Sequence, residues 1–258
     1  MARHLRIILI FLLTSEWAAA QVNADSLSID TVVSAEHKNG DYRFGYKKLI
    51  IPGVCLLYGV ASLKIDFLKD LNTSTNDEIQ EHKPKHVIWD NFSQYAPAAM
   101  VYGLNFAGVK GKHNFRDRSI IYLTSQIIMG AIVFPTKYLV KERRPDGGDT
   151  KSFPSGHTAT AFSSAQFLFR EYKDTNLWLG LSGYPLAAFT GVYRVVNNRH
   201  WVGDVVAGAG VGIFSTEFAY WLYPKINHLL VGKKSKSQIV LSPSYQQGNL
   251  GMTFAANF

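Results

Sequence analysis

Cysteine is almost absent from this 258-residue sequence. Cys55 stands alone, so no internal disulfide can form, and cysteine usage gives no indication of the redox compartment. The sequence also lacks a visible internal repeat, and polar residues such as Ser125, Gln126 and Ser182 interrupt its apolar segments. Few of these segments have the composition of a pure lipid span, and the mean hydropathy of −0.01 allows a soluble helical protein as well as a membrane protein.

Negative charge is in short supply, because 27 lysines and arginines outnumber 19 acidic residues and leave a net charge of +8. This balance favours an anionic substrate or an anionic membrane surface as a partner. The cations lie in segments that connect the apolar helices rather than along a stripe with interleaved aromatic residues, so nucleic acid is not expected as a partner.

The first informative motif contains Lys137 and Arg144, followed by Pro145. A separation of seven residues is two helical turns, so a helix would place both cations on one face. We expect Pro145 to end that helix. The arginine offers a planar fork for two phosphate oxygens and the lysine a point charge. The alternative is a basic helix end in solvent or at lipid headgroups.

The second motif is Pro154-Ser155-Gly156-His157, which precedes a run of small residues. It predicts a helix start that Ser155 caps, with unpaired backbone N–H groups that favour an anion. Gly156 would allow the backbone to approach a phosphate oxygen closely. The alternative is an ordinary helix cap followed by a packed histidine.

The third motif contains Arg194, His200 and Asp204. On a helix, residues four apart share a face, so Asp204 could accept the proton of one His200 ring nitrogen and leave the other aimed at a substrate. A turn near Asn197-Asn198 would bring Arg194 to the same site. In isolation, the pair could equally be a histidine and an aspartate that stabilise a helix surface.

The three motifs occur in order beside apolar helices and supply complementary groups for binding, attacking and protonating a phosphate. Together they resemble the signature of the type 2 phosphatidic acid phosphatase superfamily: Lys-x6-Arg-Pro, Pro-Ser-Gly-His and Arg-x5-His-x3-Asp. The resemblance covers about Lys137 to Asp204, or roughly the last two-thirds of the chain with its compatible flanking helices. Tyr193 departs from it, since the family often has serine before the arginine, and this difference bears on the shape of the pocket.

The resemblance implies a two-step phosphoryl transfer without a cofactor or metal. His200 would attack phosphorus with Asp204 orienting it, and His157 would protonate the leaving oxygen. The phosphate oxygens would be held by Lys137, Arg144, Ser155, Gly156 and Arg194. The cations would also repel a divalent metal ion, and we expect Asp146 and Asp149 to be solvated turn residues rather than metal ligands.

The expected fold is all-α: a six-helix phosphatase bundle, membrane-embedded, with a short C-terminal β-like tail. Residues 1–20 read as a signal peptide, with an uncleaved anchor as the alternative, and residues 21–45 as a flexible polar segment. The helical phosphatase domain would occupy residues 46–228, and a basic linker and tail, either a hairpin or disordered, residues 229–258. The helices are expected at 50–63, 95–109, 118–139, 157–170, 177–193 and 202–223.

Loop charges predict the orientation. Basic residues lie between Lys110 and Arg118, at Arg170 and Lys173, and after the last helix, all on the side opposite the motifs if the helices from 95 onward span. The positive-inside rule then places the active site in the periplasm and the chain in the inner membrane of a bacterial envelope. The segment 50–63 is too short to span and is expected to be re-entrant or interfacial. Residues 64–94 alternate charge and aromatics, and could form an interfacial segment.

The sequence therefore predicts a phosphatase for a membrane lipid, with a lipid A phosphate favoured over undecaprenyl diphosphate and phosphatidate-like or phosphatidylglycerophosphate lipids. The alternatives are a soluble periplasmic acid phosphatase, a vanadate-dependent haloperoxidase, which is similar at the same motifs, and a membrane scaffold without activity. No obligate protein partner is evident.

Overall fold

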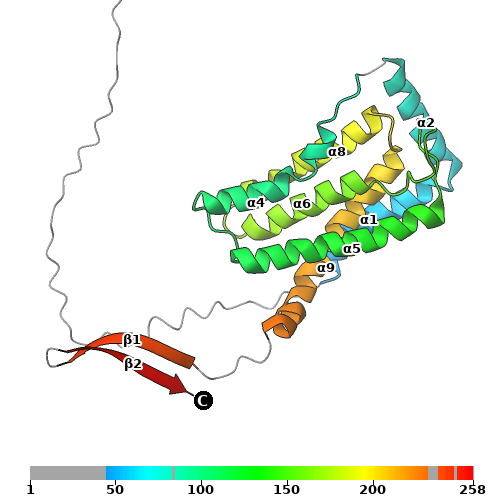
Figure 1. Cartoon of the computed structure of the whole chain (residues 1–258). Helices are drawn as coiled ribbons and strands as arrows, with labels where there is room; N and C mark the ends of the chain where they lie inside the picture. Colours follow the sequence, from blue (N-terminus) through cyan, green and yellow to red (C-terminus); the bar gives the residue numbers. More distant parts are fainter. Residues whose placement is uncertain (1–44, 83–84, 232–237, 247–248, 258) are drawn as a thin grey trace, which may run out of the picture. The chain divides into compact units, whose positions relative to one another are not determined.

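The computed structural model describes residues 45–82, 85–231, 238–246 and 249–257. The predicted signal peptide, nearly all of the polar segment at 21–45, and the basic residues at 232–237 lie outside these ranges. Helices dominate the described residues (Figure 1). They are α1 (Lys47–Ser62), α2 (Asp66–Glu81), α3 (Asp90–Ser93), α4 (Ala96–Phe106), α5 (Phe115–Val140), α6 (Gly156–Tyr172), α7 (Leu177–Leu181), α8 (Gly183–Val196) and α9 (Val202–Val231).

The described residues thus contain nine helices rather than the six that were predicted. The six expected regions are helical, but 177–193 is divided between α7 and α8, with Ser182 between them. The segment 64–94 contributes two further helices, α2 and the single turn α3. No apolar pattern in the sequence predicts them, because α2 consists mostly of polar residues.

Helix α6 is the centre of the bundle and packs against α4, α5, α8 and α9 (Figure 1). Glycine allows the closest of these approaches, because it has no side chain to separate the backbones. A Cβ atom at Gly208 would lie 2.5 Å from the Ser155 carbonyl oxygen, and one at Gly212 would collide with the Ala159 carbonyl. This contact brings the start of α9, with Asp204, against the start of α6, with Ser155 and His157.

Two helices, Phe115–Val140 and Val202–Leu230, are long and apolar enough to cross a membrane. The pair α1 and α2 meets the same requirement only together, and it is bent by 89° at the break, as in a broken span or a re-entrant loop. Large apolar side chains on α1 and α5, such as Leu57 and Ile127, point outward and are exposed. Such a surface suits contact with lipid rather than with water.

The last described residues form an antiparallel pair of strands, β1 (Gln238–Gln246) and β2 (Asn249–Asn257). Gln238 pairs with Asn257 at one end, and Gln246 pairs with Asn249 at the other.

Candidate active site

A polar pocket of about 320 Å³ lies at the end of the bundle where α6 and α9 begin. Six of the eight residues predicted for the site line it: Lys137, Arg144, Gly156, His157, Arg194 and His200. The other lining residues are Gln94, Tyr95, Met129, Val133, Phe134 and Thr160. Ser155 and Asp204 are buried and lie behind this lining. Tyr193, which departs from the motif, is not part of the lining, and its ring packs in a tilted arrangement against that of Phe189.

The two cations of the first motif reach the pocket from different elements. Lys137 is in the last turn of α5, which ends at Val140 because Lys141 adopts a left-handed conformation with φ of 53°. Arg144 follows in the loop, so the prediction that both residues share one helix ended by Pro145 is wrong. The Lys137 ammonium donates to the carbonyl oxygens of Lys151, at 2.6 Å, and Ser152, at 3.2 Å.

Arg144 is aligned by an aspartate from its own loop. Its Nε donates to Asp149 Oδ1 at 2.7 Å, and its backbone N–H donates to the Asp149 carbonyl at 3.0 Å. Asp146 pairs in the same way with Arg199, at 3.0 Å. Both aspartates are exposed loop residues, as predicted, and each also pairs with an arginine. Because Nε of Arg144 is taken, its terminal nitrogens are the donors left for an anion.

Ser155 caps α6, as predicted. Its side chain accepts the Thr158 N–H at 3.4 Å and lies 2.9 Å from Thr158 Oγ1, with none of the residue exposed. Gly156 follows as the first helical residue and lines the pocket. An anion bound here would therefore meet the helix start at Gly156, whereas the Ser155 hydroxyl is engaged within the helix cap.

His200 and Asp204 are brought together, but not by stacking on one helix. His200 precedes α9, which begins at Val202, and Asp204 is in its first turn. The distance from His200 Nδ1 to Asp204 Oδ2 is 3.5 Å, and the two residues are 2% and 1% exposed. A carboxylate beside Nδ1 favours the proton on that nitrogen, which leaves Nε2 unprotonated.

Two further groups fix the carboxylate of Asp204. Oδ2 accepts the Ser152 hydroxyl at 2.5 Å and the Trp201 backbone N–H at 3.0 Å. The second bond is the helix-start contact in which an acidic third residue reaches back to the cap. Ser152 was not singled out from the sequence, because a serine two positions before Pro154 carries no signal of a contact 52 residues away.

We expect Ser152→Ala to lower kcat by about 10- to 100-fold, which is the usual effect of removing an outer group that orients a functional histidine. The buried Asp204 carboxylate would lose a donor and hold His200 less firmly. KM should change little, because Ser152 does not line the pocket. Steady-state kinetics beside Ser152→Thr, which keeps the hydroxyl, would check this; equal losses in both variants would contradict it.

Arg194 is held by a residue that the motifs did not include. Its Nη1 donates to Asp90 Oδ2 at 2.7 Å, and both side chains are buried. Asp90 belongs to α3 and lies 104 positions earlier in the chain. The turn predicted at Asn197-Asn198 is confirmed: α8 ends at Val196, and Asn198 has a φ of 57°.

His157 also has a partner on α3. Its Nε2 lies 2.9 Å from Asn91 Oδ1, at the mouth of the pocket. The amide oxygen can only accept, so this contact places a proton on Nε2 of the neutral ring.

Both histidines are biased towards the neutral form. Burial, reinforced by the positive charge of Arg194, lowers the pKa of His157 to about 4. Burial, reinforced by Lys137, lowers the pKa of His200 well below its ordinary value. A neutral His200 retains the lone pair needed for attack on phosphorus. An anion in the pocket would offset the surrounding cations and favour protonation of His157.

Anion binding should therefore take up a proton. The pKa of free His157 is about 4, and a bound anion raises it, so affinity should increase as the pH falls through the pKa of the complex. Sulfate is a suitable probe because it does not itself titrate near neutrality. We expect calorimetry to show tighter binding at lower pH, by up to about tenfold per pH unit for one proton. His157→Gln should remove this dependence at acidic pH, and its persistence there would assign the proton to another group. Lys137, which lines the same pocket, should add a separate dependence at higher pH in both proteins, because an anion binds its charged form.

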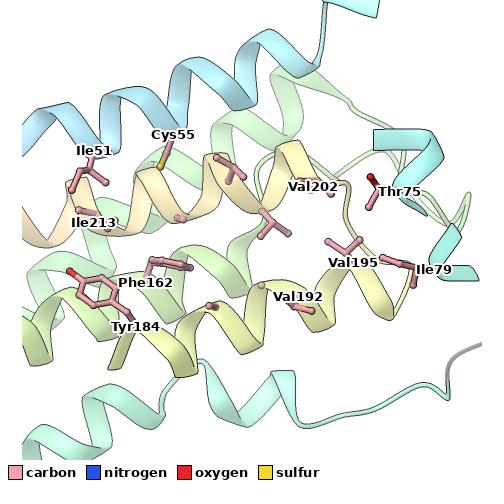
Figure 2. A pocket seen from close by; sticks show the side chains of 15 residues that line it. Ile51, Cys55, Thr75, Ile79, Phe162, Tyr184, Val192, Val195, Val202 and Ile213 are labelled. Atoms are coloured by element: carbon pink, nitrogen blue, oxygen red, sulfur yellow. The ribbon is translucent and has the colours of Figure 1, made fainter. Parts of the chain in front are cut away.

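A second, apolar pocket of about 580 Å³ lies on another side of α8 and α9 (Figure 2). Figure 2 shows Ile51 and Cys55 on α1, Ile213 on α9 and Val192 on α8 around it. None of the eight candidate residues lines this pocket. Its lining contains no cation, so it is poorly suited to phosphate, and the polar pocket remains the candidate site.

Among the residues that the structure describes, no three histidine, cysteine or acidic side chains are grouped to hold a metal ion. The polar pocket brings together one lysine, two arginines and two histidines, a set that is chemically suited to an anion.

Comparison with known proteins agrees with the resemblance stated above. Residues 118–228 match the PAP2 superfamily, and this segment contains all eight candidate residues. The resemblance of the three motifs to this superfamily is therefore confirmed. No solved structure matches the chain.

Three characterised relatives are similar to part of the chain. The lipid A 1-phosphatase of Porphyromonas gingivalis is 40% identical over 138 residues, which are 53% of this chain and 31% of the relative. The lipid A 4'-phosphatase of Bacteroides thetaiotaomicron is 37% identical over 97 residues, 37% of this chain and 39% of the relative. The bacitracin transport permease protein BcrC of Bacillus licheniformis is 35% identical over 100 residues, which are 38% of this chain and 47% of the relative. The chain thus spans less than half the length of each relative that it matches.

Proposed function

We propose that this protein is a membrane phosphatase that removes a phosphate group from a lipid, most simply a lipid A phosphate. One observation carries the proposal: His200, backed by Asp204, lines the same pocket as His157, one lysine and two arginines. Two of the relatives are named as lipid A phosphatases, and helices α5 and α9 are suited to crossing a membrane.

In the first step, Nε2 of His200 attacks phosphorus while the bond between phosphorus and the lipid oxygen breaks. His157, protonated in the complex, gives its proton to that oxygen, so the lipid leaves as an alcohol. Asp204 stabilises the positive charge that develops on the His200 ring. Lys137, Arg144 and Arg194 stabilise the charge on the phosphoryl oxygens, the main requirement in phosphoryl transfer.

In the second step, water attacks the phosphohistidine. Neutral His157 accepts a proton from this water, the bond between phosphorus and His200 breaks, and phosphate leaves. Both histidines are then ready for another cycle, and neither step needs a metal ion or a redox group. The proposed site residues are His200, His157 and Asp204 for catalysis, and Lys137, Arg144, Gly156 and Arg194 for the phosphate, with Ser155 supporting the helix start.

The proposed location is the inner membrane, with the pocket on the periplasmic side. Helix α6 extends for 17 residues from the pocket, about 25 Å, to an end where Lys112 and Lys173 contact Asp174. Basic residues thus lie at the end of the bundle away from the site, and the positive-inside rule supports a cytoplasmic position for them.

The test uses the purified protein in detergent, with a chelator present and His200→Ala beside the wild type. Phosphate release is measured from lipid A, undecaprenyl diphosphate, phosphatidate and a soluble aryl phosphate. We expect release from lipid A by the wild type only, unaffected by the chelator.

The other outcomes are equally informative. Release from a different lipid would reassign the substrate, and release from the soluble ester alone would favour an acid phosphatase. Halide oxidation that requires vanadate would favour a haloperoxidase. No activity of any kind would favour a scaffold, and a loss that metal restores would contradict the metal-free mechanism.

A further inference from the structure

The short segment around α3 lies across the mouth of the polar pocket and is fastened to α8. Before α3, the backbone of Val87 exchanges two hydrogen bonds with the Asn197 side chain, at 3.1 and 2.8 Å. At its end, the Ser93 hydroxyl lies 2.7 Å from the Thr190 hydroxyl. Polar contacts at both ends therefore fix this single turn of helix against the site.

One side of α3 contacts the groups proposed to act on the substrate. Asp90, 1% exposed, binds Arg194, and Asn91 accepts from His157. Oδ1 of Asp90 and Nε of Arg194 are buried without a hydrogen-bond partner among the described residues. The ion pair thus depends on its single contact at 2.7 Å, so a displacement of α3 would release both a phosphate-binding arginine and the proposed general acid.

The other side of the same segment carries large apolar side chains that nothing in the described structure covers. Within eight residues, four are at least half exposed: Ile88 (59%), Trp89 (65%), Phe92 (66%) and Tyr95 (54%). Three of them are aromatic, with tryptophan and tyrosine at either end. These two residue types are concentrated where a membrane meets water.

The lipid headgroup layer is the occupant that fits this surface. Tyr95 is both exposed and part of the pocket lining, so the aromatic surface is continuous with the mouth of the site. The two candidate spans also reach this end, because α5 ends at Val140 just after Lys137, and α9 begins at Val202 just after His200. A site at the ends of spanning helices lies at the level of the headgroups.

We propose that Trp89, Phe92 and Tyr95 insert into the lipid headgroup layer, and that α3, which its polar contacts hold in place, so presents His157 and Arg194 to a substrate arriving from the membrane. The inference rests on the proposed function for its substrate, a phosphorylated lipid. The anchor itself is a property of the surface and is measured without turnover. Asp90 and Asn91 act as positioning residues, since they contact the catalytic side chains rather than the phosphate pocket.

Insertion is measured with a nitroxide label at Phe92→Cys in the Cys55→Ala background, in liposomes of phosphatidylethanolamine and phosphatidylglycerol. We expect this label to collide more with oxygen, which concentrates in lipid, than with a water-soluble nickel chelate. A label at Thr150→Cys, in an exposed loop near the same pocket, should show the reverse. If Phe92 behaves like Thr150, the anchor does not exist, whatever the enzyme hydrolyses.

Its contribution to activity is measured with Trp89→Ser and Phe92→Ser. In mixed micelles we expect KM for the lipid to rise by about tenfold or more, with turnover of a soluble aryl phosphate within about twofold of the wild type. Trp178→Ser, at an 81% exposed tryptophan on α7, is the matched control and should leave both values unchanged. Equal losses on both substrates would reduce α3 to a structural element and overturn the proposal.

The contact between Asn91 and His157 is tested with Asn91→Asp. A carboxylate in this place would stabilise protonated His157, so the alkaline limb of the kcat profile for lipid A, whose leaving oxygen needs the acid, should move to higher pH. An unchanged profile would remove Asn91 from the positioning role. A wild type without phosphatase activity would overturn the proposed function while the label still reports on insertion.

Discussion

Replacing His200 by alanine is expected to abolish phosphate release, with kcat at least about 10⁴-fold lower, as for other enzymes that lose a catalytic nucleophile. His157 is the only other imidazole in the pocket lining, and its Nε2 is bonded to Asn91. Among the described residues that line the pocket, no second group is placed to attack phosphorus with a carboxylate behind it. The measurement is kcat for lipid A in detergent.

Sulfate binding is the control for the same variant. Because Lys137, Arg144 and Arg194 remain, His200→Ala should bind sulfate within a few-fold of the wild type. A variant that neither turns over nor binds sulfate would be misfolded rather than inactive, and His200→Asn would then replace it. Appreciable turnover by a folded His200 variant would mean that the nucleophile is misassigned.

Replacing His157 by alanine is expected to have an effect that depends on the leaving group. For a lipid A phosphate, whose leaving oxygen must be protonated, kcat should fall by about 10²- to 10⁴-fold, the usual contribution of a general acid. For an aryl phosphate with an activated leaving group, the first step needs no acid, and the loss should stay within about tenfold.

The comparison of the two substrates excludes a purely structural explanation. Damage to the pocket would reduce both activities to the same degree. Asn91→Ala is the matched control, because it removes the partner of His157 but leaves the acid, and it should give smaller losses with the same dependence on the leaving group. Equal losses for both substrates in His157→Ala would contradict its role as general acid.

Residues close together in the sequence were predicted well. The Ser155 helix cap, the turn at Asn197-Asn198 and the pairing of His200 with Asp204 all depend on contacts within a few residues.

Contacts between distant segments were not predictable in this way. Asp90 and Asn91 reach the site from 104 and 66 positions away, and the four-residue helix α3 that carries them is too short to show periodicity. The expectation that Arg144 shares a helix with Lys137 was wrong for a different reason. Lys141 adopts a left-handed conformation that nothing in its residue type indicates, so the helix ends before Arg144.

The central claim is that the phosphoryl group passes through His200, and the most direct measurement is to trap it there. Wild-type protein and His200→Ala are mixed with lipid A labelled in its phosphates, quenched in denaturant within milliseconds, and digested for mass spectrometry. We predict a phosphoryl group on the peptide containing His200, labile to acid and stable to base, and none in the variant. Phosphate release by the wild type through many turnovers, with no label on that peptide at any time, would contradict the account.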